Sequence, residues 1–543
     1  MKRLLILTTA LLILFALSFA AIYGGVALLD EYGIELGERA FDYDYVLKNG
    51  TIIDGTGGEI YQGDIALRKG KIRFIGIIEP PAHVQVIDAT DLYILPGFVD
   101  LYSPADLDRA QGQDFEKLVQ QGVTSVLAGF GELSSDHGIS VLQRQGKNPW
   151  PVNRALVTGY KGLAEFLEPY DLFYDLDYGD ALMEEHDFLY NSYQLAQNHG
   201  LVNYELQREV QKAMAAGAMG LYIDFDQAPG RKLTYDDVRI LATILKEQDK
   251  VLILSMPLDP QDPVALLQRL IRLQEETEVT ILLTPWDYLA TAEESLVAVL
   301  TEILQEAQES QFIRMVFYPS ATQGEGLRQP LQRAFARYPA SMIEIVAVDG
   351  QNESNLIGKT LAEVAMERSS DVATTAQTLM ARGSVQVVVR FFQPERYDRF
   401  IMSPYTFLTT HWDLSGRTDE NPIFDYLHRQ VGQGLVSWEE AAKKLSLEPA
   451  SFLGLTDRGT IEVDQWADLT VIDPRLLSSY RNLPHQVQRD DILDMTDSTE
   501  ATNLPSEDAN QYPLRYLFVN GVLLYSEGQQ VEQYPGRFLQ RNR

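Results

Sequence analysis

The sequence predicts an α/β protein with three parts: an N-terminal membrane helix, a TIM-like (β/α)8 barrel, and a small β domain from both ends of the chain. Three observations predict this arrangement. Residues 4–29 are uncharged, β-rich runs alternate with helical stretches from about 94 to 455, and turn-punctuated strands occur at 42–93 and again at 456–543.

The first thirty residues predict where the rest of the chain lies. Residues 4–29 form 26 consecutive uncharged positions, and at about 1.5 Å per helical residue they can cross a hydrocarbon core of roughly 30 Å. Two basic residues precede this run and acidic residues follow it. The positive-inside bias therefore favours an inner-membrane anchor with the body of the protein in the periplasm. The alternative is a signal peptide removed near Ala20, because Ser18-Phe19-Ala20 has the form of a cleavage site, which would release a soluble exported protein.

The composition excludes several kinds of function. The chain has 543 residues, with 45 Lys and Arg against 77 Asp and Glu, and a formal net charge of −32. This excess of negative charge repels phosphate backbones, so we expect no nucleic-acid partner. The chain has no cysteine. A disulfide, a thiolate metal site and a cysteine nucleophile of its own are therefore excluded.

Short strands with turn residues between them predict a β unit at each end of the chain. At the amino end, Asn49-Gly50 and Lys69-Gly70 are typical of hairpin turns, which need positive φ. Strand-like runs return at 467–474 and 516–524, before a C-terminal tail. We expect the unit at the carboxyl end to be a counterpart of the unit at the amino end, with the central domain between them in the sequence.

The central domain, residues 94–455, alternates strands with helices, which is typical of a parallel α/β barrel with insertions. The β-rich runs that indicate strands include 251–254, 279–283, 343–348 and 385–389. Apolar residues at three- and four-residue spacing indicate helices at 235–248, 263–276 and 292–310.

Several motifs in this order carry a family resemblance. They include Leu95-Pro96-Gly97-Phe98-Val99-Asp100, Gly217-Ala218-Met219-Gly220-Leu221, Asp457-Arg458-Gly459, Trp466-Ala467-Asp468-Leu469, Val519-Asn520-Gly521 and Pro535-Gly536-Arg537. With these motifs the chain resembles the amidohydrolase superfamily and, within it, the N-acyl-D-amino-acid deacylases. The resemblance implies a metal-dependent hydrolase barrel with a β-sandwich formed by both chain ends.

The resemblance also implies a metal site, but this chain carries other residues at its positions. The family's His-x-His is replaced by Tyr102 and Pro104, and proline offers no side-chain donor atom. The candidates for a degenerate pocket are Tyr102, Pro104, Tyr160, Ser255, Leu283 and, at the general-base position, His411. A hydrolytic zinc site needs three or more clustered ligands. We therefore expect no bound zinc or other cofactor, and we expect Tyr102, Tyr160 and Trp412 to fill the cavity.

Two functions stay open on the sequence. The first is a membrane-tethered, extracytoplasmic amidohydrolase-fold protein without catalytic activity, acting as a subunit, scaffold or binding module. Its partner is the membrane, through the N-terminal helix, and membrane proteins or a second copy of the chain are further candidates. The alternative is an active amidohydrolase that cleaves the amide bond of N-acyl-(D-)amino acids or related amides. In a metal-free variant of that reaction, Ser255 would be the nucleophile and His411 its base.

Overall fold

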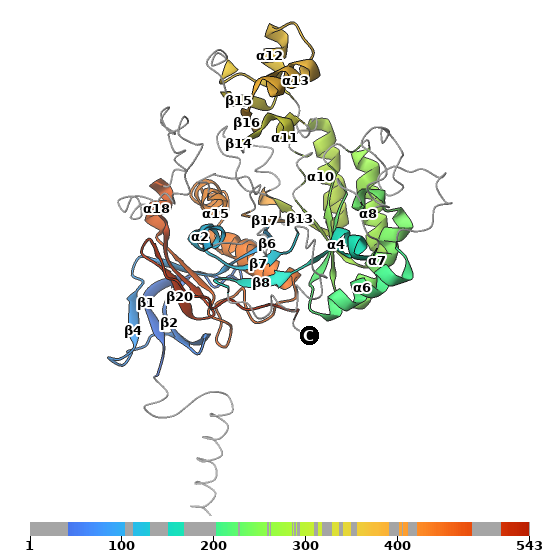
Figure 1. Ribbon diagram of the computed structural model, residues 1–543. Helices are drawn as coiled ribbons and strands as arrows, with labels where there is room; N and C mark the ends of the chain where they lie inside the picture. Colours follow the sequence, from blue (N-terminus) through green and yellow to red (C-terminus); the bar gives the residue numbers. More distant parts are fainter. Residues whose placement is uncertain are drawn as a thin grey trace, which may run out of the picture.

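The computed structural model of the protein (Figure 1) describes residues 42–103, 112–130, 150–167, 202–225, 229–257, 260, 262–284, 286, 289, 294–308, 313–317, 328–335, 340–348, 356–389, 401–403, 405–410, 421–479 and 512–541. The predicted membrane helix at 1–30, the site candidates Pro104 and His411 and the predicted cavity residue Trp412 lie outside these residues. Among the residues described, no helix combines the length and apolar character needed to cross a bilayer.

Both ends of the chain contribute to one nine-stranded sheet, whose blue and red strands lie side by side in Figure 1. In sheet order its strands are β21 (Gln529–Gln530), β20 (Val522–Ser526), β19 (Leu514–Val519), β18 (Leu469–Ile472), β5 (Tyr93–Pro96), β1 (Tyr45–Ile52), β2 (Tyr61–Arg68) and β3 (Lys71–Gly76), with β4 (Gln85–Asp88) paired to β1. The two chain ends meet in the antiparallel pair β5–β18, where Leu95 lies opposite Thr470.

The two glycine turns predicted at the amino end have different outcomes. Lys69 and Gly70, with φ of 52° and 82°, form the tight turn between β2 and β3, as predicted. Asn49 also has positive φ, at 61°, but β1 pairs with β2 on both sides of it, with a register shift between Leu47 and Gly50. The predicted hairpin turn at Asn49-Gly50 is therefore wrong. These residues form a bulge inside one strand, and the Asn49 amide donates a hydrogen bond to the Asp64 carboxylate at 2.8 Å.

The central domain is a parallel α/β barrel, so this part of the predicted fold class is confirmed. One ladder joins β6 (Phe98–Ser103), β7 (Val123–Ala128) and β8 (Asn153–Leu156). The other joins β9 (Thr158–Gly159), β10 (Gly220–Asp224), β11 (Val251–Ser255), β12 (Thr280–Leu283), β13 (Ile313–Phe317) and β17 (Thr406–Leu408). Because only Val157 separates β8 from β9, the two act as one staggered strand, and these strands supply eight positions around the barrel.

Helices connect the barrel strands, and α6, α7, α8 and α10 lie along their outer side in Figure 1. Between the strands the chain forms α2 (Gly112–Gln120), α4 (Tyr160–Leu167), α6 (Tyr204–Ala215), η2 (Gly230–Lys232), α7 (Tyr235–Glu247), α8 (Pro263–Thr277) and α10 (Glu294–Gln308). After the last barrel strand come α15 (Pro422–Tyr426), η4 (Leu427–Val431), α16 (Trp438–Ala442), η5 (Lys443–Leu447), α17 (Glu448–Phe452) and α18 (Pro474–Ser479). The local sequence determines where α7 begins, because Thr234 and Asp237 form a capping box at its first turn.

The side chains of the barrel strands divide between two cores. The inner core fills the barrel and includes Leu101, Leu127, Ala155, Ile253, Leu282, Val316 and Phe407. The outer core lies between strands and helices, where Leu254 and Leu283 pack in the same cluster as Leu241 and Leu270. Since neighbouring strand residues point to opposite faces, each strand serves both cores.

The barrel closes between β6 and β17 through side chains. Among the described residues no ladder joins these two strands. Instead the Asp100 carboxylate accepts hydrogen bonds from the Thr410 amide, at 2.9 Å, and from the Thr410 hydroxyl, while the Thr409 hydroxyl donates to the Tyr102 carbonyl at 2.7 Å. Asp100 is buried, and this burial raises the pKa of its carboxyl.

A small α/β unit is inserted between β13 and β17, and it stands apart at the top of Figure 1. Its elements are β14 (Arg328–Pro330), α11 (Leu331–Phe335), β15 (Ile343–Val348), α12 (Leu361–Glu367), α13 (Val372–Arg382) and β16 (Val385–Val389). The runs 343–348 and 385–389 were expected among the parallel barrel strands, and this was wrong. They pair antiparallel with each other over a separate core that includes Ile345 and Val387.

Candidate functional site

The mouth of the barrel, at the carboxyl ends of its strands, is where a fold of this kind places its functional groups. Tyr102 lies near the end of β6, and Phe130 follows two residues after β7. Tyr222 and Asp224 occupy the last part of β10, and Ser255 ends β11. Phe130 is buried, and the other four are half-buried.

Three rings from this set form an aromatic cluster, which we define as Tyr102, Phe130 and Tyr222. The ring centroids of Tyr102 and Phe130 are 4.5 Å apart with an interplanar angle of 55°. Phe130 and Tyr222 meet edge to face, with centroids 5.4 Å apart and an angle of 89°. These are favourable contact geometries for aromatic rings. The cluster continues the inner core of the barrel up to its mouth.

The Tyr222 hydroxyl has hydrogen-bond partners both inside the aromatic cluster and next to it. The Tyr222 hydroxyl is hydrogen-bonded to the side chains of both Ser255 and Tyr102. Burial, with smaller contributions from Tyr102 and Asp224, raises the pKa of Tyr222 well above its ordinary value. The phenol therefore stays protonated near neutral pH, so Tyr222 can donate a hydrogen bond but is a poor general base.

These residues do not fit a catalytic zinc ion. Such an ion is held by three protein ligands drawn from imidazole, thiolate and carboxylate groups. The aromatic cluster, Ser255 and Asp224 offer two phenols, a phenyl ring, one hydroxyl and a single carboxylate. The Asp100 carboxylate already accepts hydrogen bonds from the Thr410 and Tyr102 amides, both at 2.9 Å. Within the part of the chain that the structure describes, no group of three or more His, Asp or Glu side chains is placed to hold a metal.

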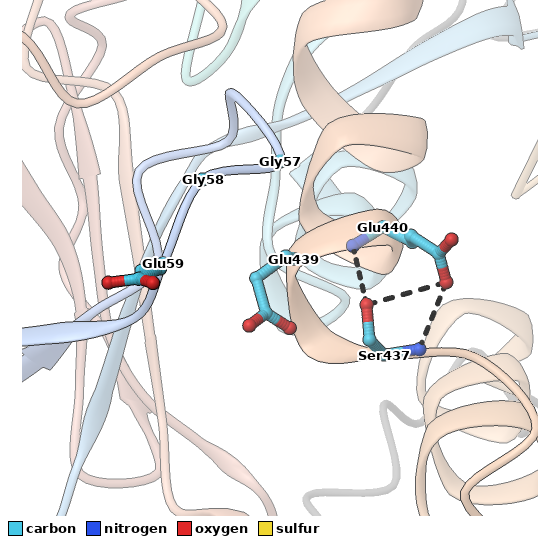
Figure 2. Close-up of a pocket in the computed structure, with 6 residues that line it drawn as sticks. All are labelled: Gly57, Gly58, Glu59, Ser437, Glu439 and Glu440. Carbon is cyan, nitrogen blue, oxygen red and sulfur yellow. Dashed lines mark hydrogen bonds between the residues drawn. The ribbon is translucent and has the colours of Figure 1, made fainter.

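A hollow of about 400 Å³ lies between the loop that follows β1 and the start of α16 (Figure 2). It is lined by Gly57, Gly58, Glu59, Ser437, Glu439 and Glu440. The Glu440 carboxylate is engaged in a capping box with Ser437. In Figure 2 the Glu59 side chain points away from Glu439, so the two carboxylates do not converge on one ligand. This hollow therefore lacks an assembled set of functional groups.

The sequence is similar to known amidohydrolases. A model described as "Amidohydrolase family" matches residues 401–530. The D-aminoacylase of Alcaligenes xylosoxydans xylosoxydans is 22% identical over 515 residues, which cover 92% of this chain and 98% of the relative. The N-acyl-D-glutamate deacylase of the same organism is 21% identical over 457 residues, which cover 79% of this chain and 87% of the relative.

Solved structures share the fold over nearly the whole chain. A crystal structure of D-aminoacylase has a TM-score of 0.65 at 19% identity, covering 92% of this chain and 100% of the other. The chain has the amidohydrolase fold of the D-aminoacylases. The N-acyl-D-glutamate deacylase from Bordetella bronchiseptica, in complex with zinc and a phosphonate inhibitor, has a TM-score of 0.62 at 18% identity. The match covers 92% of this chain and 99% of the other. The resemblance predicted from the motifs is thereby confirmed.

The structure describes four of the six predicted site residues, and they lie in different environments. Tyr102 and Ser255 meet at the barrel mouth through Tyr222. Leu283 lies in the outer core, while its neighbour Leu282 points into the barrel. Tyr160 begins α4 and is also buried in the outer core, so the expectation that it fills the metal cavity is wrong. Pro104 and His411 lie outside the described residues.

Two residues of the aromatic cluster were missed by sequence reasoning. Phe130 follows shortly after the β-rich run at 123–128. Its place after a strand was the signal that could have found it. Tyr222 gives no comparable signal, because its inward direction follows from the pairing of β10 with β11, where Tyr222 lies opposite Ile253.

Proposed function

We propose that this chain is an amidohydrolase-fold protein without hydrolytic activity, held at the outer face of the plasma membrane, where it serves as a subunit, scaffold or binding module. One observation carries the proposal: the aromatic cluster stands at the mouth of the barrel, where this fold would need metal ligands. Tethering is supported by the 26 uncharged residues at 4–29.

Hydrolysis at this mouth would need an activated water and a group that accepts its proton. The Tyr222 phenol has a raised pKa, and the Asp100 carboxylate is enclosed by the amides that it binds. Neither group suits the role of general base near neutral pH. These properties support binding or scaffolding rather than catalysis.

Metal content and amide hydrolysis, measured on the full chain extracted in detergent, test the proposal. We expect no stoichiometric zinc and no hydrolysis of N-acyl-D-amino acids above the uncatalysed rate, with or without added zinc. A D-aminoacylase assayed in the same detergent is the positive control. Stoichiometric zinc together with chelator-sensitive hydrolysis would overturn the proposal. Copurification with membrane proteins in stoichiometric amounts would identify the subunit role.

The second candidate is an active amidohydrolase acting on N-acyl-(D-)amino acids or related amides. Similarity to D-aminoacylase over 92% of this chain and 98% of the relative favours this candidate. The similarity supports an active enzyme more directly than it supports a protein without hydrolytic activity. In a metal-free mechanism Ser255 would be the nucleophile and His411 the base. Ser255→Ala and His411→Ala would then each abolish turnover, and unchanged rates in either variant would eliminate that mechanism.

A further inference from the structure

We propose that the Phe130 ring, packed between Tyr102 and Tyr222, physically excludes a divalent cation from the barrel mouth. Restoring imidazoles alone would then fail to restore a metal site. The inference rests on the proposed function and deepens it, because it gives a second reason, the space that Phe130 occupies, why this mouth would not bind the metal.

The three rings come from the ends of β6, β7 and β10, which converge at the mouth. With centroids at 4.5 Å, Tyr102 and Phe130 are in direct contact, and Phe130 is equally in contact with Tyr222 at 5.4 Å. Zinc bound to an imidazole sits about 2.0–2.1 Å from the nitrogen and needs further ligands around it. A histidine at position 102 would therefore direct its ion into the volume of the Phe130 ring.

Phe130 is 7% exposed and belongs to the same apolar cluster as Leu101 and Leu127 inside the barrel. An ion beside it would lose hydration without gaining a polar partner from the ring. The Tyr222 hydroxyl is meanwhile satisfied by Ser255 and Tyr102, so the cluster has its own polar contacts. The mouth is thus built as packed core and does not need an ion for its stability.

Cobalt binding to the full chain in detergent tests this inference. The starting variant is Tyr102→His/Pro104→His, which restores the two imidazoles of the family motif. We compare it with the same variant carrying Phe130→Ala, using equilibrium dialysis and the visible absorption of bound cobalt. We expect weak binding by the starting variant and an affinity at least about tenfold higher after Phe130→Ala, since the surroundings of a metal site alter affinity by roughly 10- to 100-fold.

Phe407→Ala in the same starting variant is the matched control. Phe407 is also a buried inner-core phenylalanine, packed edge to face on Phe452 at 5.2 Å, and its truncation leaves a similar cavity. We expect no gain in cobalt affinity from it. Phe130→Val replaces Phe130→Ala if the latter fails to fold, and the same comparison applies.

Three results would overturn the inference. The starting variant could bind cobalt as tightly as the Phe130→Ala variant, both could fail to bind, or Phe407→Ala could raise affinity equally. These results are distinct from failure of the proposed function. Zinc-free hydrolysis by the natural chain would refute that function and leave the exclusion of the ion intact, because the cobalt experiment reads no activity.

Discussion

The barrel mouth and the junction between the barrel and the nine-stranded sheet both bury polar groups, but they do so with different chemistry. At the junction, the Asp468 carboxylate accepts hydrogen bonds from the Arg458 guanidinium at 2.5 Å, the Asn153 side chain at 3.0 Å and the Asn520 amide at 2.6 Å. Asp468 and Arg458 are 4% and 3% exposed. At the mouth, the contacts among Tyr102, Phe130, Tyr222 and Ser255 are made by rings and neutral hydroxyls.

The junction also gathers motifs that are far apart in the sequence. The Arg537 guanidinium lies over the Trp466 ring at 3.6 Å, and the Trp466 indole donates to Asp457 at 3.0 Å. The Asn520 side chain donates to the Pro535 carbonyl at 2.8 Å. These residues belong to the motifs that resemble the amidohydrolases. The comparison teaches that this resemblance reports how the two chain ends are joined to the barrel, and it says little about the chemistry at the mouth.

The largest effect is expected from Asp468→Ala. This change removes the buried partner of Arg458 and leaves its guanidinium only the more exposed Asp457, at 3.3 Å. Breaking a buried ion pair lowers the free energy of unfolding by about 3–5 kcal/mol. Denaturant unfolding of the full chain measures it. The control is Glu367→Ala, which breaks an exposed ion pair to Lys359 and should cost less than about 1 kcal/mol. Equal losses in the two variants would remove the distinction between junction and surface.

Phe130→Ala should lower the free energy of unfolding by about 3 kcal/mol, because it opens a cavity among the rings at the mouth. The same unfolding experiment applies. Phe130→Leu keeps an apolar side chain of similar reach and should lose clearly less. A loss under about 1 kcal/mol for Phe130→Ala would mean that the mouth is not packed as a core, and the comparison with the junction would fail.

Tyr222→Phe isolates the contribution of the hydroxyl. It keeps the ring contact with Phe130 and removes the hydrogen bonds to Ser255 and Tyr102, so we expect a loss of about 1 kcal/mol. Ser255→Ala, which removes the other partner of that bond, is the matched change. A loss for Tyr222→Phe as large as that of Phe130→Ala would show that polar contacts, rather than rings, hold the mouth together.

The smallest effect concerns pH. Burial raises the pKa of the Asp100 carboxyl above its ordinary value of 3.8. The folded chain then binds this proton more tightly than the unfolded chain, so the stability from this group is complete below about pH 4 and is lost as pH rises through the folded pKa. Asp100→Asn should therefore make the free energy of unfolding fall less steeply as pH rises from 4 to 7.

Burial raises the pKa of Asp468 in the same direction, but its partner is a charged guanidinium. Asp468→Asn should consequently cost more stability at every pH than Asp100→Asn, whose hydrogen-bond partners are neutral. Similar costs for the two asparagine variants would contradict the contrast between a buried carboxyl with a charged partner at the junction and one with neutral partners near the mouth.

Much of the fold could be predicted from local pattern, and the errors have one cause. Alternation of strands with helices predicted the barrel, and Lys69-Gly70 predicted a real turn. The run 343–348 looks like any barrel strand, yet β15 pairs antiparallel with β16 in the insertion. Asn49-Gly50 has the backbone conformation of a turn but lies within β1. In both cases the partner strand decides the outcome, and it lies outside the local pattern.

The candidate site was predicted in part, for a related reason. Tyr102 was found because it follows the motif that ends at Asp100, and Ser255 because it follows the β-rich run at 251–254. Phe130 and Tyr222 were missed, and Tyr160 was misplaced, because the face to which a side chain points depends on strand register and on where a helix begins. Those properties are set by pairing across the sheet.

By itself the sequence determined that thiolate chemistry is excluded and that the first family ligand positions carry tyrosine and proline, since these follow from residue identity alone. It also determined the strand and helix alternation that makes a barrel. Only the tertiary structure decided that Tyr102, Phe130 and Tyr222 touch, and that Asp468 meets Arg458 and Asn520. Such contacts join residues distant along the chain, and only the pairing and closure of whole strands brings them within reach.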